Sequence, residues 1–297
     1  MGMLLGRDPG VKHRATRSAE GGWTCRGRAP RVFPMRIARL PIPVALAAVS
    51  LALGAQPAAA ADPWAAGPVS TVGKLIWDAG GGRLGLCSGA VVEAPNGSVV
   101  ATAAHCVRSQ EQPEPPDEVW FVPGYDHGID SYREDGWRVA AFHTPEGWDV
   151  TRGTTEILPH DYAFLTVGEK EGRTLQEAHG ANRLAFEPVA EGAEVAVLGY
   201  PAAGPYDGES LYHCAGLTDV LTEGEAQRPN LGGLMLEGCD LTAGSSGGPW
   251  VREWAADGQS GTVVAVMSVG SGEGMVVGRP FPREARALLE TAGAPGR

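Results

Sequence analysis

The chain has 297 residues, of which 43% are hydrophobic and 20% charged, and it carries a formal net charge of -11. These values are typical of globular proteins and exclude a disordered or collagen-like chain. The acidic balance argues against nucleic acid or an anionic membrane as a partner. Its 43 glycines and 23 prolines are spread without a period, which favours an all-β fold of short strands and many turns.

Residues 35–61 have the layout of a secretory signal peptide. A short basic start precedes an apolar run, and Ala59-Ala60-Ala61 offers an A-x-A cleavage site before Asp62. A membrane anchor is the alternative, but three prolines interrupt a run that is marginal for spanning a bilayer. We therefore expect a secreted, extracellular protein with no membrane partner after cleavage.

Residues 1–34 lie upstream of a plausible start at Met35 and are either a discarded leader or a mis-assigned translation start. Residues 1–61 hold nine of the 24 Lys and Arg and two of the 35 Asp and Glu. The rest of the chain then has 15 basic and 33 acidic residues and a formal charge of -18. Such a surface keeps a secreted protein soluble.

After the leader, short apolar runs alternate with turns, as expected for strands. The pattern predicts a first β unit over residues 62–167, a linker over 168–193 and a second β unit over 194–297. Apolar residues at helical spacing in 282–291 predict a short C-terminal helix packed on the second unit.

Four of the five cysteines follow the leader: Cys87, Cys106, Cys214 and Cys239. An even count in a secreted chain predicts two disulfides, although four cysteines allow three pairings and the spacing does not choose among them. No C-x-x-C and no clustered His and Cys spacing predicts a metal site, and we expect no cofactor.

The segment CDLTAGSSGGPW at 239–250 contains G-x-S-x-G over residues 244–248, the pattern of the α/β-hydrolase nucleophile turn. Those enzymes place the histidine base after the serine in the chain, and no histidine follows His213. The hydrolase interpretation therefore lacks its base, and only the order His, Asp, Ser remains.

The segments CSGAVV, TAAHC, DYAFL and GSSGGP occur in that order between residues 69 and 281. They resemble the chymotrypsin/trypsin family of serine proteases. The resemblance implies two six-stranded antiparallel β-barrels with the active site between them, and peptide hydrolysis through an acyl-enzyme.

By this resemblance, TAAHC makes His105 the general base and DYAFL makes Asp161 the residue that orients it. Asp149 and Asp126 are weaker candidates for the second role. A serine nucleophile needs a base within hydrogen-bond reach and a carboxylate that holds the base.

The resemblance also makes Ser246, before Gly-Gly-Pro, the nucleophile, with the backbone N–H groups of Gly244 and Ser246 as the oxyanion hole. Animal trypsins carry an aspartate immediately before the nucleophile, which pairs with a newly freed N-terminus. This chain has Ser245 there, so that route to activation is not available. In this respect it is closer to the secreted bacterial trypsin-like and V8-like branch.

For the cysteines, the resemblance implies a disulfide between Cys87 and Cys106, which leaves Cys214 to pair with Cys239. The competing pairings would cross-link the two β units.

Substrate selection is less defined by the sequence. Asp240 stands six residues before Ser246, where trypsin-like enzymes hold the aspartate that binds Arg or Lys, but it could equally be a structural carboxylate bonded to loop backbone. Met267 occupies the position of the histidine that V8-like enzymes use for acidic side chains, which disfavours glutamate. Ser268, Val269 and Gly270 resemble the strand segment that pairs with the substrate backbone.

The sequence therefore predicts a secreted, monomeric serine endopeptidase acting on a peptide or protein. We find no pro-segment between Asp62 and Val69 and expect the enzyme to be active as secreted. Two alternatives stay open: a binding protein that keeps the fold without proteolysis, and an esterase that uses the same residues.

Overall fold

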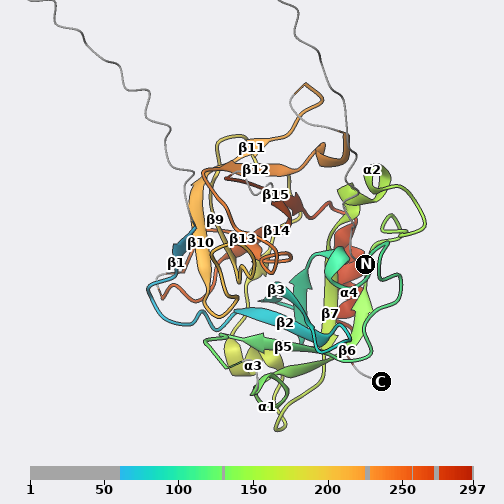
Figure 1. The fold of residues 1–297 in the computed structure, drawn as a ribbon, viewed down its shortest axis with the longest axis vertical. Coiled ribbons are helices and arrows are strands. Elements are labelled where there is room, and N and C mark those ends of the chain that lie inside the picture. The colour runs from blue at the N-terminus through green and yellow to red at the C-terminus, as the bar shows by residue number, and fades with distance from the viewer. Residues whose placement is uncertain (1–60, 129–130, 225–227, 256, 271–273, 296–297) are drawn as a thin grey trace, which may run out of the picture. The chain divides into compact units, whose positions relative to one another are not determined.

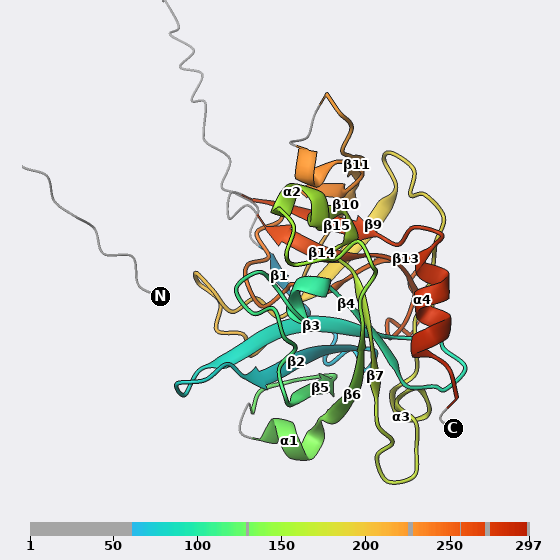
Figure 2. The ribbon, with the colours of Figure 1, turned by 90° about the vertical axis from the view of Figure 1, so that its right-hand side faces the viewer.

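The computed structural model describes residues 61–128, 131–224, 228–255, 257–270 and 274–295. The predicted leader at 1–34 and the signal peptide at 35–61 lie outside this part of the chain, apart from Ala61. Figures 1 and 2 show the chain from two directions.

The first β unit is a closed barrel of six antiparallel strands in the order β2-β3-β4-β7-β6-β5. Valine is common at the buried positions of these strands, as expected from the preference of β-branched residues for strands, and aromatic and other aliphatic side chains occupy further buried positions. The strands are β2 (Val72–Asp78), β3 (Leu84–Val92), β4 (Val99–Thr102), β5 (Val119–Pro123), β6 (Trp137–His143) and β7 (Ala163–Val167).

The second β unit is a nine-stranded sheet in which β1-β10-β9-β13-β14-β15-β12-β11 follow one another and β8 pairs with β14. Six longer strands form its body: β9 (Glu194–Gly199), β10 (Tyr212–Leu217), β12 (Leu234–Glu237), β13 (Pro249–Arg252), β14 (Thr262–Gly270) and β15 (Met275–Pro280). Three two-residue strands join them: β1 (Asp62–Pro63), β8 (Arg183–Leu184) and β11 (Asp219–Val220). The predicted all-β, chymotrypsin-like fold is confirmed, and the first unit is the expected six-stranded barrel. The second unit was expected as another six-stranded barrel, but its six longer strands belong to a nine-stranded sheet because the three short segments pair with them.

The helices are short: η1 (Ala104–Cys106), α1 (Tyr132–Asp135), α2 (Thr154–Ile157), η3 (Leu158–His160), α3 (Leu175–His179), η4 (Arg228–Asn230) and α4 (Ala285–Ala292). The region expected as a linker, 168–193, carries α3 and β8, and a capping box of Thr174 and Glu177 begins α3. In the described part of the chain, no helix is long and apolar enough to cross a membrane.

Helix α4 forms as predicted, but the expectation that it packs on the second unit is wrong. It lies against β6 and β7 of the first barrel (Figure 1). The hydroxyl of Thr166 and the side-chain amide of Asn96 donate hydrogen bonds of 2.8 and 2.9 Å to the Ala292 carbonyl. An amphipathic helix buries its apolar face wherever apolar surface is offered, and here the first barrel offers it.

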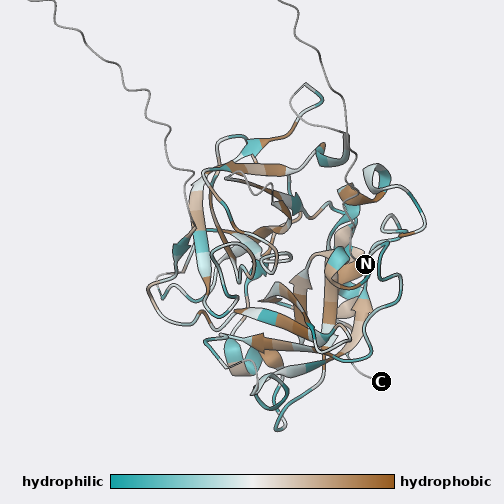
Figure 3. Ribbon diagram, viewed as in Figure 1, coloured by the Kyte–Doolittle hydropathy of each residue, from teal (hydrophilic) through white to brown (hydrophobic). Residues whose placement is uncertain are grey.

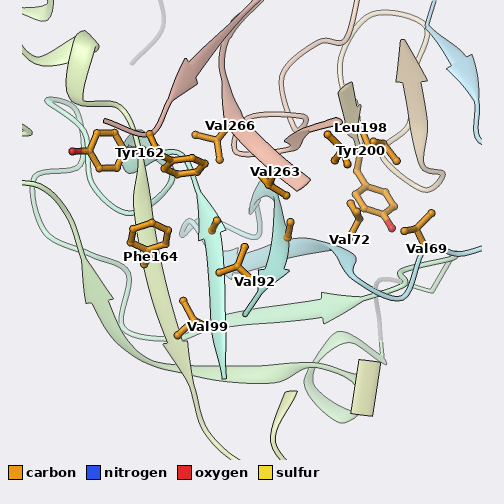
Figure 4. Close-up of a cluster of buried hydrophobic side chains, with 14 of the residues drawn as sticks. Val69, Val72, Val92, Val99, Tyr162, Phe164, Leu198, Tyr200, Val263 and Val266 are labelled. Carbon is orange, nitrogen blue, oxygen red and sulfur yellow. The ribbon is translucent and has the colours of Figure 1, made fainter. Parts of the chain in front are cut away.

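A hydrophobic cluster shared by both β units joins them. Figure 4 shows Val92 and Phe164 of the first barrel in the same cluster as Leu198 and Val263 of the second unit, and each is fully buried. Along the strands, apolar segments dominate, while the connecting loops are largely polar (Figure 3). The shared core fixes the two units against each other, and the candidate site lies where they meet.

Candidate active site

His105 lies in the short helix η1, which follows β4 of the first barrel. The next residue, Cys106, is bonded to Cys87 of β3, with a Cα–Cα distance of 6.2 Å. The Thr102 hydroxyl donates to the Ser88 carbonyl at 2.8 Å, which joins the end of β4 to β3. The backbone that carries His105 is therefore held on both sides.

Asp161 contacts both the imidazole and the backbone of His105. His105 Nδ1 lies 2.8 Å from Asp161 Oδ2, and the His105 backbone N–H donates to Asp161 Oδ1 at 2.9 Å. The hydroxyl of Ser268 donates to the same Asp161 Oδ2 at 2.5 Å. The carboxylate is fully buried while the His105 side chain is 30% exposed, so the ring is fixed on one side and open on the other.

The two side chains perturb each other. Burial opposes the charged form of the imidazole, but the Asp161 charge and hydrogen bond outweigh it and raise the pKa of His105. Burial would likewise raise the pKa of Asp161, yet the interaction with His105 and the bonds from Ser268 and the backbone lower it. Asp161 is therefore an ionised partner that stabilises a positive imidazole.

The loop that carries Ser246 is packed against the same segment. The Ser88 N–H donates to the Ser246 carbonyl at 2.7 Å, and that carbonyl oxygen lies 3.6 Å from Cys106 Sγ. Gly247 and Met267 join the loop to β14 through two hydrogen bonds: Gly247 N–H to Met267 O at 2.7 Å, and Met267 N–H to Gly248 O at 2.8 Å. Ser246 is thus fixed beside the residue that follows His105.

Gly244 supplies the sharp turn before Ser246. Its φ of +99° lies in the region that favours glycine, and a Cβ there would lie 2.5 Å from the Tyr200 carbonyl. The Ser88 hydroxyl donates to the Gly244 carbonyl at 2.9 Å. Within the described part of the chain, the N–H groups of Gly244 and Ser246 donate no hydrogen bond, so both are free for a ligand oxygen.

Ser245, the other serine of the pair, points into the protein. It is fully buried, and in the described residues its hydroxyl has no hydrogen-bond partner. A Cβ on Gly199 would lie 2.6 Å from the Ser245 Cβ, so little space surrounds it. Of the two serines, Ser246 is the one that is not fully buried.

The two weaker candidates for the orienting carboxylate lie elsewhere. Asp149 accepts bonds from the Thr151 hydroxyl and N–H at 2.7 and 3.0 Å in an exposed turn. Asp126 pairs with His127 at 2.7 Å. Neither is bonded to His105.

Ser268, Val269 and Gly270 form the end of β14. This segment pairs with β15 on one side, whereas β13 pairs with β14 only over Val266 to Thr262. A Cβ on Gly270 would lie 2.8 Å from the Leu241 carbonyl, so the segment runs beside the 240–241 backbone. In the described part of the chain, no strand pairs with the second edge of this segment.

Asp240 is half-buried and already has partners on one oxygen. Its Oδ1 accepts the Ala61 N–H at 2.7 Å and the Tyr206 hydroxyl at 2.6 Å. Burial and the neighbouring carboxylate raise the pKa of Tyr206 to about 12. The residue that the sequence places at the substrate pocket is thus bonded to this chain's own backbone.

The second disulfide joins Cys214 of β10 to Cys239, with a Cα–Cα distance of 5.7 Å, so both pairs implied by the resemblance are present. The possible metal-ligand atoms of Cys87, Cys106 and His105, namely the two sulfurs and one imidazole nitrogen, lie within 4.8 Å of one another. Both sulfurs are in the disulfide, so this group offers no thiolate to a metal.

Two functional contacts escaped the sequence reasoning. The Ser88 hydroxyl bridges the Gly244 carbonyl and the Tyr200 N–H, which donates to it at 3.0 Å. Ser268 was expected only as part of the substrate strand, but its hydroxyl also holds Asp161. Ser88 belongs to the CSG segment, and its place next to Cys87 is the one signal that could have indicated it.

A profile described as "Trypsin-like peptidase domain" matches residues 87–266, more than half of the chain. A comparison with curated proteins found no match.

Among solved structures, the protease Anisep from Arthrobacter nicotinovorans is 29% identical, covers 76% of this chain and 96% of its own, and has a TM-score of 0.64. The thermostable serine protease AL20 from an extremophilic microorganism is 28% identical, covers 76% and 97%, and has a TM-score of 0.64. A Glu endopeptidase at 16% identity covers 76% and 91% with a TM-score of 0.55 and shares the fold. The chain belongs to the trypsin-like peptidase domain family.

Proposed function

We propose that this protein is a secreted serine endopeptidase in which His105, Asp161 and Ser246 form a catalytic triad. The observation that carries the proposal is the buried Asp161 carboxylate bonded to His105, with the Ser246 loop packed against Cys106. Family membership and the similarity to serine proteases support the same reaction class.

The reaction follows from the roles of these groups. Ser246 Oγ attacks the peptide carbonyl carbon while His105 Nε2 accepts the hydroxyl proton, and Asp161 stabilises the resulting imidazolium. The carbonyl oxygen, now negative, accepts bonds from the N–H groups of Gly244 and Ser246. His105 then donates the proton to the leaving amine, and an acyl-enzyme remains on Ser246. Water, deprotonated by His105, attacks the acyl-enzyme and releases the acid.

The Ser246 hydroxyl makes no hydrogen bond in the part of the chain that the structure describes. Contacts between nucleophile and base are commonly loose before substrate binds and tighten in the complex. The substrate backbone would add a strand along Ser268–Gly270, which brings its carbonyl beside the Ser246 loop.

A fluorophosphonate reagent tests the nucleophile. The secreted protein is labelled, digested and mapped by mass spectrometry, alongside Ser246→Ala and the matched control Ser245→Ala. We expect the label on Ser246, none in Ser246→Ala, and normal labelling in Ser245→Ala, because the buried Ser245 hydroxyl holds no partner. A folded sample without label, or a label that survives in Ser246→Ala, contradicts the proposal.

Hydrolysis of a mixed peptide library separates the remaining interpretations. Peptide cleavage that is lost in Ser246→Ala supports the endopeptidase. Turnover of simple esters without peptide cleavage supports an esterase. No turnover of either by folded protein supports a binding protein of the same fold.

A further inference from the structure

Ala61 lies directly before β1 and is buried beside Asp240, the residue that the sequence places at the substrate pocket. It is only 5% exposed, and its backbone nitrogen lies 2.7 Å from Asp240 Oδ1. The Tyr206 hydroxyl bonds to the same oxygen at 2.6 Å, and among the described residues Asp240 Oδ2 has no hydrogen-bond partner. Asp240 therefore has acceptor capacity left beside a nitrogen that donates a single proton while it is part of a peptide bond.

The fold places Ala61 there through strand pairing. Asp62 and Pro63 form β1, which pairs with β10 in the register Asp62 to His213 and Pro63 to Tyr212 (Figure 1). In an antiparallel pair, the residue before Asp62 lies toward the residue after His213, which is Cys214. The disulfide partner of Cys214 is Cys239, and Asp240 follows it directly. One strand pair and one disulfide thus bring the two ends of this contact together.

We propose that Asp240 is the receptor for the α-ammonium of Ala61, formed when the leader is cleaved between Ala60 and Ala61. This inference rests on the proposed function of a secreted peptidase. Hydrolysis of that peptide bond adds one water: the carbonyl of Ala60 becomes a carboxylate, and the nitrogen of Ala61 gains protons and becomes an ammonium. Ala58-Ala59-Ala60 satisfies the small-residue rule for cleavage as well as Ala59-Ala60-Ala61 does, and it moves the cut one residue earlier.

Cleavage after Ala60 keeps the buried Ala61 and its contact with Asp240. An ammonium has three donors, so it can bond to both Asp240 oxygens, and a separation of 2.7 Å is typical of charge-assisted hydrogen bonds. Cleavage after Ala61 would remove this donor, leaving Asp240 Oδ1 with Tyr206 and an empty space where a buried residue sits. The pair also holds the backbone that precedes the Ser246 loop.

The pairing also determines what the substrate pocket selects. The Leu241 carbonyl lies against Gly270, so Asp240 sits beside the segment that receives substrate. A carboxylate that is bonded to an internal ammonium has its charge neutralised, and it no longer favours an Arg or Lys side chain over an uncharged one. Asp240 is then a positioning residue of the pocket and not its cation-binding group.

The first test uses the full chain, expressed with its leader in a secreting host. Intact mass and N-terminal sequencing of the product should give Ala61 as the first residue. A product that begins at Asp62 overturns the proposal.

The second test measures how fast an acylating reagent modifies the terminal amine near pH 7, where only the neutral amine reacts. We expect acylation roughly tenfold slower in the folded protein than in urea, the factor for one pKa unit of ammonium stabilisation. Asp240→Asn should remove this protection, whereas Asp207→Asn, an exposed neighbour of Tyr206 that is not bonded to Ala61, should keep it. Equal rates in folded and unfolded wild-type protein contradict the pair even if Asp240→Asn does not fold.

Peptide cleavage by the same variants separates this proposal from a substrate-binding role. We expect Asp240→Asn to lower kcat/KM about equally for peptides with Arg, Lys and uncharged residues at the cleavage site. A selective loss of Arg and Lys cleavage, with the amine still protected, would assign Asp240 to substrate. Because the mass and acylation readouts need no activity, a protein that is protected at Ala61 but unlabelled at Ser246 would contradict the proposed function alone.

Discussion

Gly247 offers the most stringent test of how the Ser246 loop is held. A methyl group at this position would lie 2.0 Å from Thr102 Oγ1, 2.4 Å from the Ser88 carbonyl oxygen and 2.8 Å from the Ala103 nitrogen. The closest of these is more than an ångström inside ordinary contact, which is about 3.5 Å. Two of the three atoms are backbone, so they cannot turn aside as a flexible side chain does.

Two costs therefore add in Gly247→Ala. Its φ of +79° costs a residue with a Cβ about 1–2 kcal/mol, and overpacking adds about 1–3 kcal/mol. Gly192→Ala is the matched control, because its φ is +70° and nothing lies within 4 Å of the added methyl group. Only the backbone cost of about 1–2 kcal/mol applies there.

The assay is urea denaturation of both variants together with the rate of fluorophosphonate labelling at Ser246. We expect Gly247→Ala to lose more stability than Gly192→Ala and to label at least about tenfold more slowly, because the strain falls on the residue after the proposed nucleophile. Gly192→Ala should label at the wild-type rate. Equal stability and equal labelling of the two variants would refute the packing argument.

Three further expectations concern the groups around His105. The pKa of His105 is raised above 6.5 and the base must be neutral, so kcat/KM should fall as the pH drops through that raised value. Asp161→Asn should lower the pKa of His105, move the acidic limb of the pH profile to lower pH and reduce kcat by about 10⁴-fold. Ser268→Ala removes a donor to a buried carboxylate and should cost about 2 kcal/mol in urea denaturation, whereas an unchanged midpoint would mean that the hydroxyl contributes nothing. Replacing Cys87 and Cys106 together by serine opens a loop with a sequence separation of 19 and should lower the free energy of unfolding by about 3 kcal/mol. Fluorophosphonate labelling of Ser246 should also slow, and an unchanged labelling rate would show that the disulfide does not position the Ser246 loop.

Much of the site could be predicted because its chemistry is carried by short contiguous segments. TAAHC, DYAFL and GSSGGP each contain one residue of the proposed triad, and their order in the chain excluded the hydrolase alternative. The structure brings His105 and Asp161 into contact and packs the Ser246 loop beside them. The first barrel could also be predicted, since short apolar runs separated by turns are typical of strands.

Other features depend on partners that local patterns do not specify. The spacing of apolar residues in α4 predicts that one face is buried but not which β unit covers it. The spacing of Asp240 from Ser246 in the sequence predicts a carboxylate in the substrate pocket, whereas its partner Ala61 is 179 residues away in the chain. A strand of two residues, such as β1, is too short to show a periodic pattern, so its pairing cannot be predicted from its own sequence.

The candidate site belongs to neither β unit alone. His105 and Asp161 come from the first barrel and Ser246 from the second unit, and hydrogen bonds from Ser268 to Asp161 and from Ser88 to the Ser246 carbonyl cross the boundary.

Lys74 is a fully buried ionisable side chain at this boundary. Its side chain is fully buried and donates across the boundary to the Gly208 carbonyl at 2.7 Å. Burial lowers the pKa of Lys74 even though Glu209, 3.5 Å away, favours its charged form. Burial removes the hydration of this ammonium, so the hydrogen bond to Gly208 and the interaction with Glu209 must offset that cost. The same boundary holds the Ser246 carbonyl 3.6 Å from Sγ of Cys106, the residue after His105, so the geometry of the candidate site depends on both units.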